Sequence, residues 1–437
     1  MTSNPPVKIR NSTPATRLEN GLEKQALYGK IIRRIVPYLM LIYMVAFLDR
    51  VNISFAALTM NRDLGISETI YGFSAGVFFL SYCLFQVPAN MLLARLGARR
   101  WLGTLMVLWG IDVMATAFVG GVPSYVTARL LLGIAESGFY PGIIFYFTFW
   151  MPPSARTRIL ALFLLSLPLC NAIGSPISAH ILLMDRVLGL HGWQWLFLIE
   201  GAPAILLGVA TWFILTDTPQ SAHWLSTDEK ARLAGDMHAE LPKASASSGR
   251  IVSVLRDSAI YFLWSSANYG LIFFLPKILT ARGASALSSG WWATLTFGVG
   301  ALSMYLASRS RGFRSLPPLF LVASLGFAAI AFIQSLPVTL VGFCVAAIGL
   351  MASIPIFWSL AASRFSGKAA GTAIAIVNSA GAVGAFCGPY AMGWLRDFTH
   401  TYTAGLWAIA VSVLVGAVLV LADAQAGRSP QPRGVQS

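Results

Sequence analysis

Four charged residues lie inside apolar stretches long enough to cross a membrane: Asp49, Arg50, Arg129 and Glu136. Charges at bilayer depth are costly and usually line a polar cavity. Arg129 and Glu136 are seven residues apart, and at about 100° per residue this spacing puts both on one helix face. An arginine fork matches a carboxylate through two parallel hydrogen bonds. The four residues therefore indicate a buried site for an organic anion.

The formal charges of these four residues sum to zero, so a bound monoanion would leave the site net negative in a low dielectric. One proton on Glu136 or Asp49 offsets that charge and frees an arginine from its carboxylate partner. We therefore predict that Arg50 and Arg129 bind the anion and that Asp49 and Glu136 couple it to protons. The alternative is a purely structural ion-pair network between two helices. Asp49, which lies 100° from Arg50, could also cap a helix or pair elsewhere.

Polar side chains in other apolar stretches are predicted to line the same cavity: Tyr82, Asn171, Asn268, Asn378 and Ser379. Packing within a helix bundle also accounts for many membrane asparagines and serines, so this prediction is open to a structural explanation. Asp112 and Glu200 are further acids in apolar stretches. Either could titrate, although an inter-helix hydrogen bond or a structural pairing explains them as well.

Composition indicates what must position these residues. The chain has 437 residues, of which 56% are hydrophobic and 11% charged, whereas a soluble domain carries about 25% charged residues. A spanning helix needs roughly 20 mostly apolar residues. Twelve such segments are expected, near residues 35–56, 70–93, 101–120, 124–149, 159–184, 194–215, 258–279, 289–308, 317–335, 338–361, 369–395 and 403–423. The fold predicted is an all-α membrane protein with twelve transmembrane helices in two six-helix halves.

A polar segment at 216–257 divides the spans into six and six. It contains Ser226-Thr227-Asp228-Glu229, which predicts a helix start. The expected organisation is a tail (1–34), an N-terminal bundle (35–215), a central loop (216–257), a C-terminal bundle (258–423) and a second tail (424–437). The polar N-terminus has no apolar core and is not expected to be a signal peptide.

The net charge of +14 is distributed unevenly. Of the 31 basic residues, 24 fall in the tails, the central loop and the other connections on that side, and five fall on the opposite side. The remaining two are Arg50 and Arg129. Such an asymmetry predicts cytoplasmic termini and a multi-pass protein of the plasma (inner) membrane. It also explains the basicity without any binding to nucleic acid.

Two spacings suggest duplication of a six-helix unit. Gly133 and Ser137 correspond to Gly349 and Ser353, 216 residues later, and Ala172-x-x-Ser175-Pro176 corresponds to Ala385-x-x-Gly388-Pro389, 213 residues later. Two such halves around a midplane site are typical of alternating-access transporters. The equivalents of Arg129 and Glu136 are Val345 and Ala352, so the charge is confined to the first half.

No metal site, cofactor or enzymatic activity is predicted. The four cysteines and five histidines are scattered, and no metalloprotease motif occurs in the sequence. The expected partners are a small organic anion, protons and the lipid bilayer, and we expect a monomer.

Six motifs in order resemble the anion:cation symporter family of the major facilitator superfamily. They are Leu48-Asp49-Arg50-Val51-Asn52-Ile53, Gln86-Val87-Pro88-Ala89-Asn90, Gly97-Ala98-Arg99-Arg100-Trp101, Arg129-Leu130-Leu131-Leu132-Gly133-Ile134-Ala135-Glu136-Ser137-Gly138, Gly192-Trp193-Gln194-Trp195-Leu196-Phe197-Leu198-Ile199-Glu200-Gly201 and Asn378-Ser379-Ala380-Gly381. The resemblance covers residues 30–425. It implies a twelve-helix facilitator fold and proton-coupled uptake of organic anions, with Asp49, Arg50, Arg129, Glu136 and Tyr82 at the substrate and proton sites.

Two departures from the family pattern matter. The stretch Leu93-Ala94-Arg95-Leu96-Gly97 lacks the acid that usually precedes the basic cluster, which puts a gating salt bridge there in doubt. Phe47 stands where sugar-acid members often carry a tyrosine, which favours an aromatic or tartrate-like carboxylate over a sugar acid. The function predicted is import of a small organic anion by proton symport. The alternative is exchange or efflux of an anion by the same fold.

Overall fold

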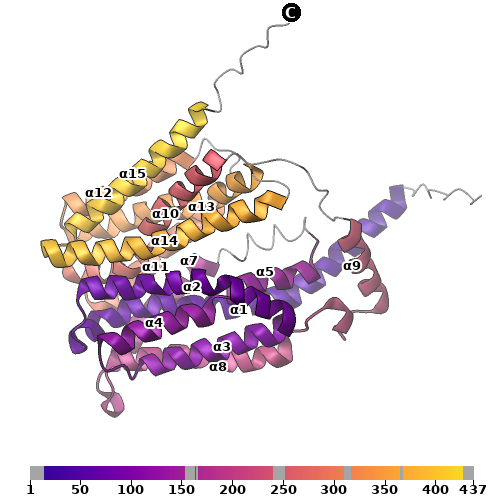
Figure 1. Ribbon diagram of the computed structural model, residues 1–437, viewed down its shortest axis with the longest axis horizontal. Coiled ribbons are helices and arrows are strands. Elements are labelled where there is room, and N and C mark those ends of the chain that lie inside the picture. The colour runs from indigo at the N-terminus through magenta and orange to yellow at the C-terminus, as the bar shows by residue number, and fades with distance from the viewer. Residues whose placement is uncertain are drawn as a thin grey trace, which may run out of the picture.

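The computed structural model describes residues 14–152, 163, 166–239, 251–309, 316–364 and 368–426, and every regular element in these ranges is helical. The long helices run roughly side by side and form two groups (Figure 1). One group holds the helices before the central segment, and the other holds those after it. We call these groups the N-terminal half and the C-terminal half.

In the described ranges, the N-terminal half contains seven helices. They are α1 (Pro14–Asp63), α2 (Glu68–Leu96), α3 (Ala98–Thr116), α4 (Val122–Glu136), α5 (Phe139–Trp150), α7 (Ser166–Ile181) and α8 (Gly192–Ile214). A 3-10 turn, η1 (Val187–Gly189), lies between α7 and α8, and a second one, η2 (Pro219–Ser221), follows α8. The central segment contributes α9 (Thr227–Ala239).

The part of the C-terminal half that the structure describes contains six helices. They are α10 (Ile251–Ala281), α11 (Ala286–Ala307), α12 (Leu316–Phe332), α13 (Leu336–Arg364), α14 (Lys368–Thr399) and α15 (Thr403–Ala426). Eight of the helical segments in the described ranges are long and apolar enough to cross a membrane. Each of the twelve expected spans lies on a helix, although part of the fifth, at 159–162 and 164–165, is outside the described residues.

The fourth expected span is broken into α4 and α5 at Ser137 and Gly138. Pro141 explains the break, because its nitrogen carries no hydrogen and cannot bond the Ser137 carbonyl four residues earlier. The helix resumes with the Gly142 N–H donating to the Gly138 carbonyl at 3.0 Å. The two pieces together still form one apolar span of 29 residues.

Helix packing repeats between the halves. Within the N-terminal half, α1 packs on α7 and α8, α2 on α4, and α3 on α8. Within the C-terminal half, α10 packs on α14 and α15, α11 on α13, and α12 on α15. These are the same pairs shifted by six spans, as the two internal repeats predicted. The two halves contact each other through α2 with α14 and through α7 with α11. A shift of six spans converts the first of these pairs into the second.

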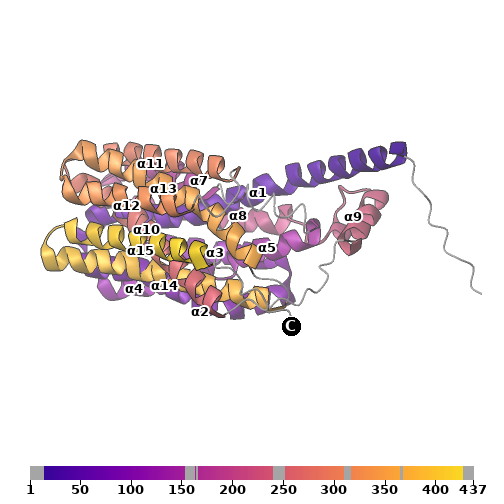
Figure 2. The same cartoon turned by 90° about the horizontal axis from the view of Figure 1, so that it is seen from above.

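Helix α9 and the start of α1 extend beyond the bundle at the end where α15 also ends (Figure 2). We call this the proximal end and the opposite one the distal end. The predicted helix start in the central segment is confirmed: α9 begins at Thr227, and the Ser226 hydroxyl accepts from the Glu229 N–H at 3.2 Å. Helix α1 begins at Pro14, so it runs through residue 34, where the tail was expected to end. The division into tails, bundles and central loop stays a prediction.

Candidate functional site

An ion pair between α1 and α4 lies inside the N-terminal half. Arg50 Nη2 donates to Glu136 Oε2 at 2.8 Å, and the two side chains are only 8% and 3% exposed. Arg50 Nη1 donates to the Ala46 carbonyl one turn earlier at 2.9 Å, which fixes the guanidinium along its own helix. Glu136 Oε1 is buried and has no hydrogen-bond partner in the described part of the chain. The structure thus joins two of the four predicted charges and leaves one carboxylate oxygen available.

Arg129 is buried on α4, with 3% of its surface exposed. Its Nε and Nη2 atoms have no hydrogen-bond partner among the residues that the structure describes. The guanidinium lies 5.2 Å from the centre of the Phe78 ring on α2, and the Arg50 guanidinium lies 4.6 Å from the same ring. Both arginines are therefore held by one aromatic side chain through cation–π contacts. Arg129 thus keeps two free donor groups for an anion, whereas on Arg50 only Nε lacks a partner in the described ranges.

Asp49 is 2% exposed and forms no ion pair in the described ranges. Its Oδ1 accepts from Asn52 Nδ2 at 3.3 Å, and its Oδ2 is buried without a partner. The neighbouring Arg50 side chain points to Glu136 instead, consistent with the 100° that separates consecutive residues on a helix. The two predicted proton-coupling acids thus differ, because Glu136 has a cationic partner and Asp49 has an amide.

Aromatic side chains surround the charged residues. The predicted Tyr82 lies next to Phe78, with ring centres 6.0 Å apart. Phe79 on α2 contacts Tyr269 on α10 at 4.3 Å, so aromatic rings from both halves meet close to the ion pair. Tyr43 adds a ring from α1, where its centre is 5.3 Å from that of Phe47. Sequence reasoning missed Phe78 and Tyr269, because an aromatic residue in an apolar span carries no signal of its own.

The polar side chains predicted to line the cavity differ from one another in burial and in hydrogen bonding. Asn171 is buried and bonds the Leu167 carbonyl on its own helix at 2.9 Å. Asn268 is 6% exposed on α10, and its Oδ1 has no partner in the described ranges. Asn378 and Ser379 are half-buried on α14. Asn171 therefore has a local packing role in this structure, while Asn268 offers a free polar atom.

The C-terminal half presents apolar and aromatic side chains at the depth where the N-terminal half carries buried charges. Ala352, the counterpart of Glu136, is 3% exposed, and four aromatic rings cluster nearby on α10 and α13. Tyr261 stacks at 5.4 Å on Phe357 and at 5.6 Å on Trp264, and meets Trp358 edge-on at 5.0 Å. Gly381 on α14 makes room for this cluster, because a Cβ there would lie 2.2 Å from Tyr261 Cε1. This half contributes shape rather than charge.

The two halves are joined at the distal end by polar contacts, which we call the distal seal (Glu68, Thr69, Tyr71, Lys277 and Asp397). Lys277 on α10 pairs with Glu68 on α2 at 2.7 Å and lies 4.8 Å from the Tyr71 ring centre. Asp397 on α14 accepts from the Thr69 N–H at 2.7 Å and from the Thr69 hydroxyl at 2.6 Å. Asp397 thus caps the first turn of α2 from the other half of the molecule.

Close helix packing continues the distal seal toward the midplane. A Cβ at Gly72 would lie 2.2 Å from the Pro389 carbonyl oxygen, so α2 and α14 touch backbone to backbone. Nearer the proximal end, Val87 on α2 lies about 60° around the helix from Gly72 and is 68% exposed. On α14, nothing lies within 4 Å of a Cβ built at Gly371. The halves therefore touch at the distal end and part at the proximal end.

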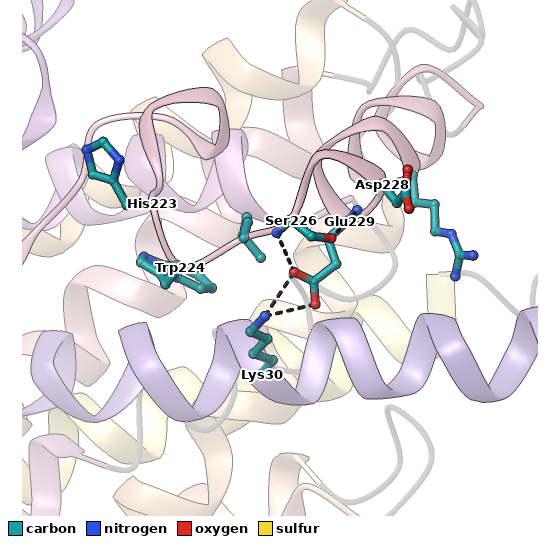
Figure 3. A pocket seen from close by; sticks show the side chains of 8 residues that line it. Lys30, His223, Trp224, Ser226, Asp228 and Glu229 are labelled. Carbon is teal, nitrogen blue, oxygen red and sulfur yellow. Dashed lines mark hydrogen bonds and ion pairs between the residues drawn. The ribbon is translucent and has the colours of Figure 1, made fainter.

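A separate cavity of about 480 Å³ lies between α1 and α9 at the proximal end (Figure 3). Two of its charges pair with each other: Lys30 Nζ bonds both Glu229 oxygens at 2.9 Å, and the Ser226 N–H donates to Glu229 at 2.8 Å. These two donors hold the pKa of Glu229 below its usual range. Trp224 stacks on Trp150 at 5.4 Å. This cavity marks where α9 docks on the N-terminal half, far from the buried charges.

The loop between α2 and α3 is tied down within its own half. The Arg99 N–H donates to Asp217 Oδ1 at 2.9 Å, and the Arg99 Nε lies 3.6 Å from Asp217 Oδ2. Asp217 follows α8, so it provides an acidic partner for the basic cluster even though the acid expected before that cluster is missing. The sequence contained this acid in Thr216-Asp217-Thr218-Pro219, but nothing in the pattern related it to Arg99.

Comparison with known proteins agrees with this architecture. The sequence model of the Major Facilitator Superfamily matches residues 39–389. A putative tartrate transporter of Agrobacterium vitis is 42% identical over 413 residues, which cover 92% of each chain. A quinolone resistance transporter of Acinetobacter baumannii is 33% identical over 399 residues, covering 88% of this chain and 92% of that protein.

Among solved structures, the fold is similar to that of a bacterial homologue of the human lysosomal transporter Spinster, in an inward-facing and occupied conformation. The TM-score is 0.74 at 16% sequence identity, over 91% of this chain and 98% of the other. The likeness concerns the fold alone.

Proposed function

The chain belongs to the Major Facilitator Superfamily, and on that premise we propose that it imports a small organic anion by proton symport. That it is a multi-pass membrane transporter rather than an enzyme follows from the family and from its relatives, and the resemblance that the motifs predicted is confirmed. The observation that carries the proposal is Arg129, a buried arginine with unpaired donors beside an arginine that already has a carboxylate partner.

The charge balance supports proton coupling. In the Arg50–Glu136 pair the two charges cancel, which leaves Arg129 and Asp49. With Asp49 protonated, the site carries one net positive charge and accepts a monoanion at Arg129. With Asp49 ionised, the same anion would make the site net negative in a low dielectric, which is unfavourable. Anion and proton therefore favour each other's binding.

The chemistry of the site supports a carboxylate as the anion. The guanidinium of Arg129 offers parallel N–H donors that a carboxylate accepts in a bidentate manner. The name of the Agrobacterium relative favours a tartrate-like hydroxy acid, while the aromatic rings around Tyr269 and Tyr261 would also accommodate an aromatic acid. Tyr82, Asn268, Asn378 and Ser379 are proposed as further contacts, and Asn171 as a lining residue.

The distribution of the basic residues supports one orientation of the protein in the membrane. Their excess on the side of the termini supports cytoplasmic termini in the plasma membrane. In that orientation the distal seal closes the outer side, and the parting of α2 from α14 faces the cytoplasm. The structure then represents an inward-facing state, and rocking of the two halves about the buried charges would expose the site to the other side.

The test is uptake into proteoliposomes. An inward proton gradient should drive accumulation of a radiolabelled carboxylate from a panel of tartrate, benzoate and galacturonate, and a protonophore should abolish it. Asp49→Asn should retain exchange of internal for external anion but show weaker gradient-driven uptake, because no proton can then bind at that position. Accumulation of the carboxylate to the same level with and without a proton gradient would refute the proposed proton coupling.

The alternative is exchange or efflux of an anion by the same fold. The quinolone resistance transporter that this chain resembles favours it, since the name of that relative associates it with resistance. The same proteoliposomes distinguish the two modes: trans-stimulated flux with no response to a proton gradient indicates exchange. An outward-directed flux that runs against its own gradient at the expense of proton entry indicates efflux.

A further inference from the structure

A third buried acid lies in the N-terminal half, outside the site described above. Glu200 on α8 is 4% exposed. Its Oε1 accepts from the Ser178 hydroxyl on α7 at 2.7 Å, and its Oε2 is buried with no hydrogen-bond partner in the described ranges. Ser178 itself is fully buried. A carboxyl group with one neutral donor and no cation has little to stabilise its charged form at bilayer depth.

The surroundings of Glu200 link it to Asp49. Asn52 on α1 is fully buried, donates to Asp49 Oδ1 at 3.3 Å, and also interacts with the Glu200 carboxyl group. One amide thus lies between two acids, and one of its own polar atoms, Oδ1, has no partner among the described residues. A single amide cannot compensate two negative charges, so the two acids compete for protons through it.

Arg50 and Arg129 act on Asp49, whereas no cation among the described residues acts on Glu200 from the three helices packed on α8. Helix α1 contributes Asp49, and α7 contributes the Cys170 thiol, which is neutral unless deprotonated. On α3, Asp112 interacts with Arg129 rather than with Glu200. A Gln at position 200 could make the same hydrogen bonds without the risk of a buried charge. An acid at this position adds only the capacity to take up and release a proton.

We propose that Glu200 is a second protonation site of the transport cycle. The inference rests on the proposed function, because it assumes that Asp49 carries a proton with the anion. Glu200 holds a proton on its carboxyl group while the distal end is sealed, and it releases that proton when the cycle hydrates the interface of α1, α7 and α8. Two protons, rather than one, then accompany each anion.

The test measures the charge carried per substrate in proteoliposomes, with radiolabelled tartrate as the probe. At a fixed tartrate gradient and a membrane potential clamped at zero, the pH gradient that nulls net flux reports the number of protons per tartrate. The expected result for Glu200→Gln is one positive charge fewer per tartrate than in wild type, with exchange retained. Asp112→Asn, a matched acid-to-amide change on the neighbouring helix, should leave the charge unchanged.

An unchanged charge in Glu200→Gln overturns the second site while leaving proton coupling intact. If wild-type flux does not respond to the proton gradient, both the second protonation site and the proposed function are overturned. Should Glu200→Gln fail to fold, Ser178→Ala provides the second test. Removing the only hydroxyl donor disfavours the ionised carboxylate, so the pH at which driven uptake is half-maximal should rise. An identical pH profile for Ser178→Ala and wild type would also overturn the proposal.

Discussion

The two halves of the molecule share one packing scheme and differ in the chemistry of their inner faces. Helix pairs recur in both halves with a shift of six spans, yet Arg129 and Glu136 of the first half correspond to Val345 and Ala352 of the second. The first half holds paired and unpaired charges, and the second holds stacked aromatic rings. The two halves therefore share one packing framework, while the buried ion pair lies in the first half and the stacked aromatic cluster in the second.

The largest effect is expected from removing the unpaired guanidinium of the N-terminal half. Arg129→Lys keeps the charge but loses the planar fork, and hydrogen bonds to charged groups contribute about 1.5–3 kcal/mol. We expect anion binding to weaken by about 10- to 100-fold, since each 1.4 kcal/mol is a factor of ten. Thermal-shift titration with the carboxylate panel measures this loss.

Arg282→Lys is the matched control, because Arg282 is exposed at the distal end and bonds Gln334 rather than an anion. It should bind the carboxylates as wild type does. Wild-type affinity in Arg129→Lys would remove Arg129 from the binding site.

The shape of the C-terminal half is tested at Gly381. Gly381→Ala places a methyl group against the Tyr261 ring, and overpacking of this kind costs typically about 1–3 kcal/mol. The cluster of Tyr261 with its aromatic neighbours should shift, so we expect a lower melting temperature and a change in the ratio of benzoate to tartrate uptake. Gly371→Ala on the same helix meets no atom within 4 Å and should leave both unchanged. Equal behaviour of the two variants would show that the aromatic cluster does not shape the site.

The junction between the halves is tested at Asp397. Asp397→Ala removes the cap that the C-terminal half supplies to α2, and loss of a helix cap costs about 1 kcal/mol. Because this contact exists only when the distal end is sealed, the variant should shift the population toward distal opening, seen as longer spin-label distances between α2 and α14.

Asp185→Ala serves as control for the seal. Asp185 accepts from the Gly192 N–H at the start of α8, so it caps a helix within a single half. That variant should lose stability without any change in the distances between the halves. A similar shift in both variants would mean that general destabilisation, rather than the seal, opens the distal end.

The smallest effect concerns α9, which docks on the N-terminal half alone. The pKa of Glu229 is lowered by Lys30 and by the Ser226 N–H. A lowered folded-state pKa means that docking is stabilised above the ordinary pKa of glutamate, about 4.3, and that this stabilisation is lost as the pH falls through the lowered value. Spin-label distances between α1 and α9 should lengthen over that acidic range. Glu229→Gln should show no such pH dependence, and a transition of the same size in that variant would assign the effect to another group.

The sequence predicted the spans, the two-half organisation and the identity of the buried charges. These features could be predicted because long apolar runs are typical of membrane spans, and charges within such runs usually line a polar cavity. It did not predict that Arg50 pairs with Glu136, because the rotation of α1 against α4 is set by packing across many residues. Lys277 is one of the five basic residues on the side opposite the termini, yet the structure buries it between the halves, where Glu68 compensates its charge. The helix cap that Asp397 provides to α2 could not be predicted either, because Asp397 and Thr69 are 328 residues apart in sequence.

The central claim is that the N-terminal half takes up a proton when it binds the anion. Isothermal titration calorimetry of the purified protein in buffers with different heats of ionisation measures this directly, because protons taken up by the protein are released by the buffer. The account predicts proton uptake on carboxylate binding by wild type, and less of it in Asp49→Asn, where the site already lacks one negative charge. Binding with the same heat in every buffer would contradict the account.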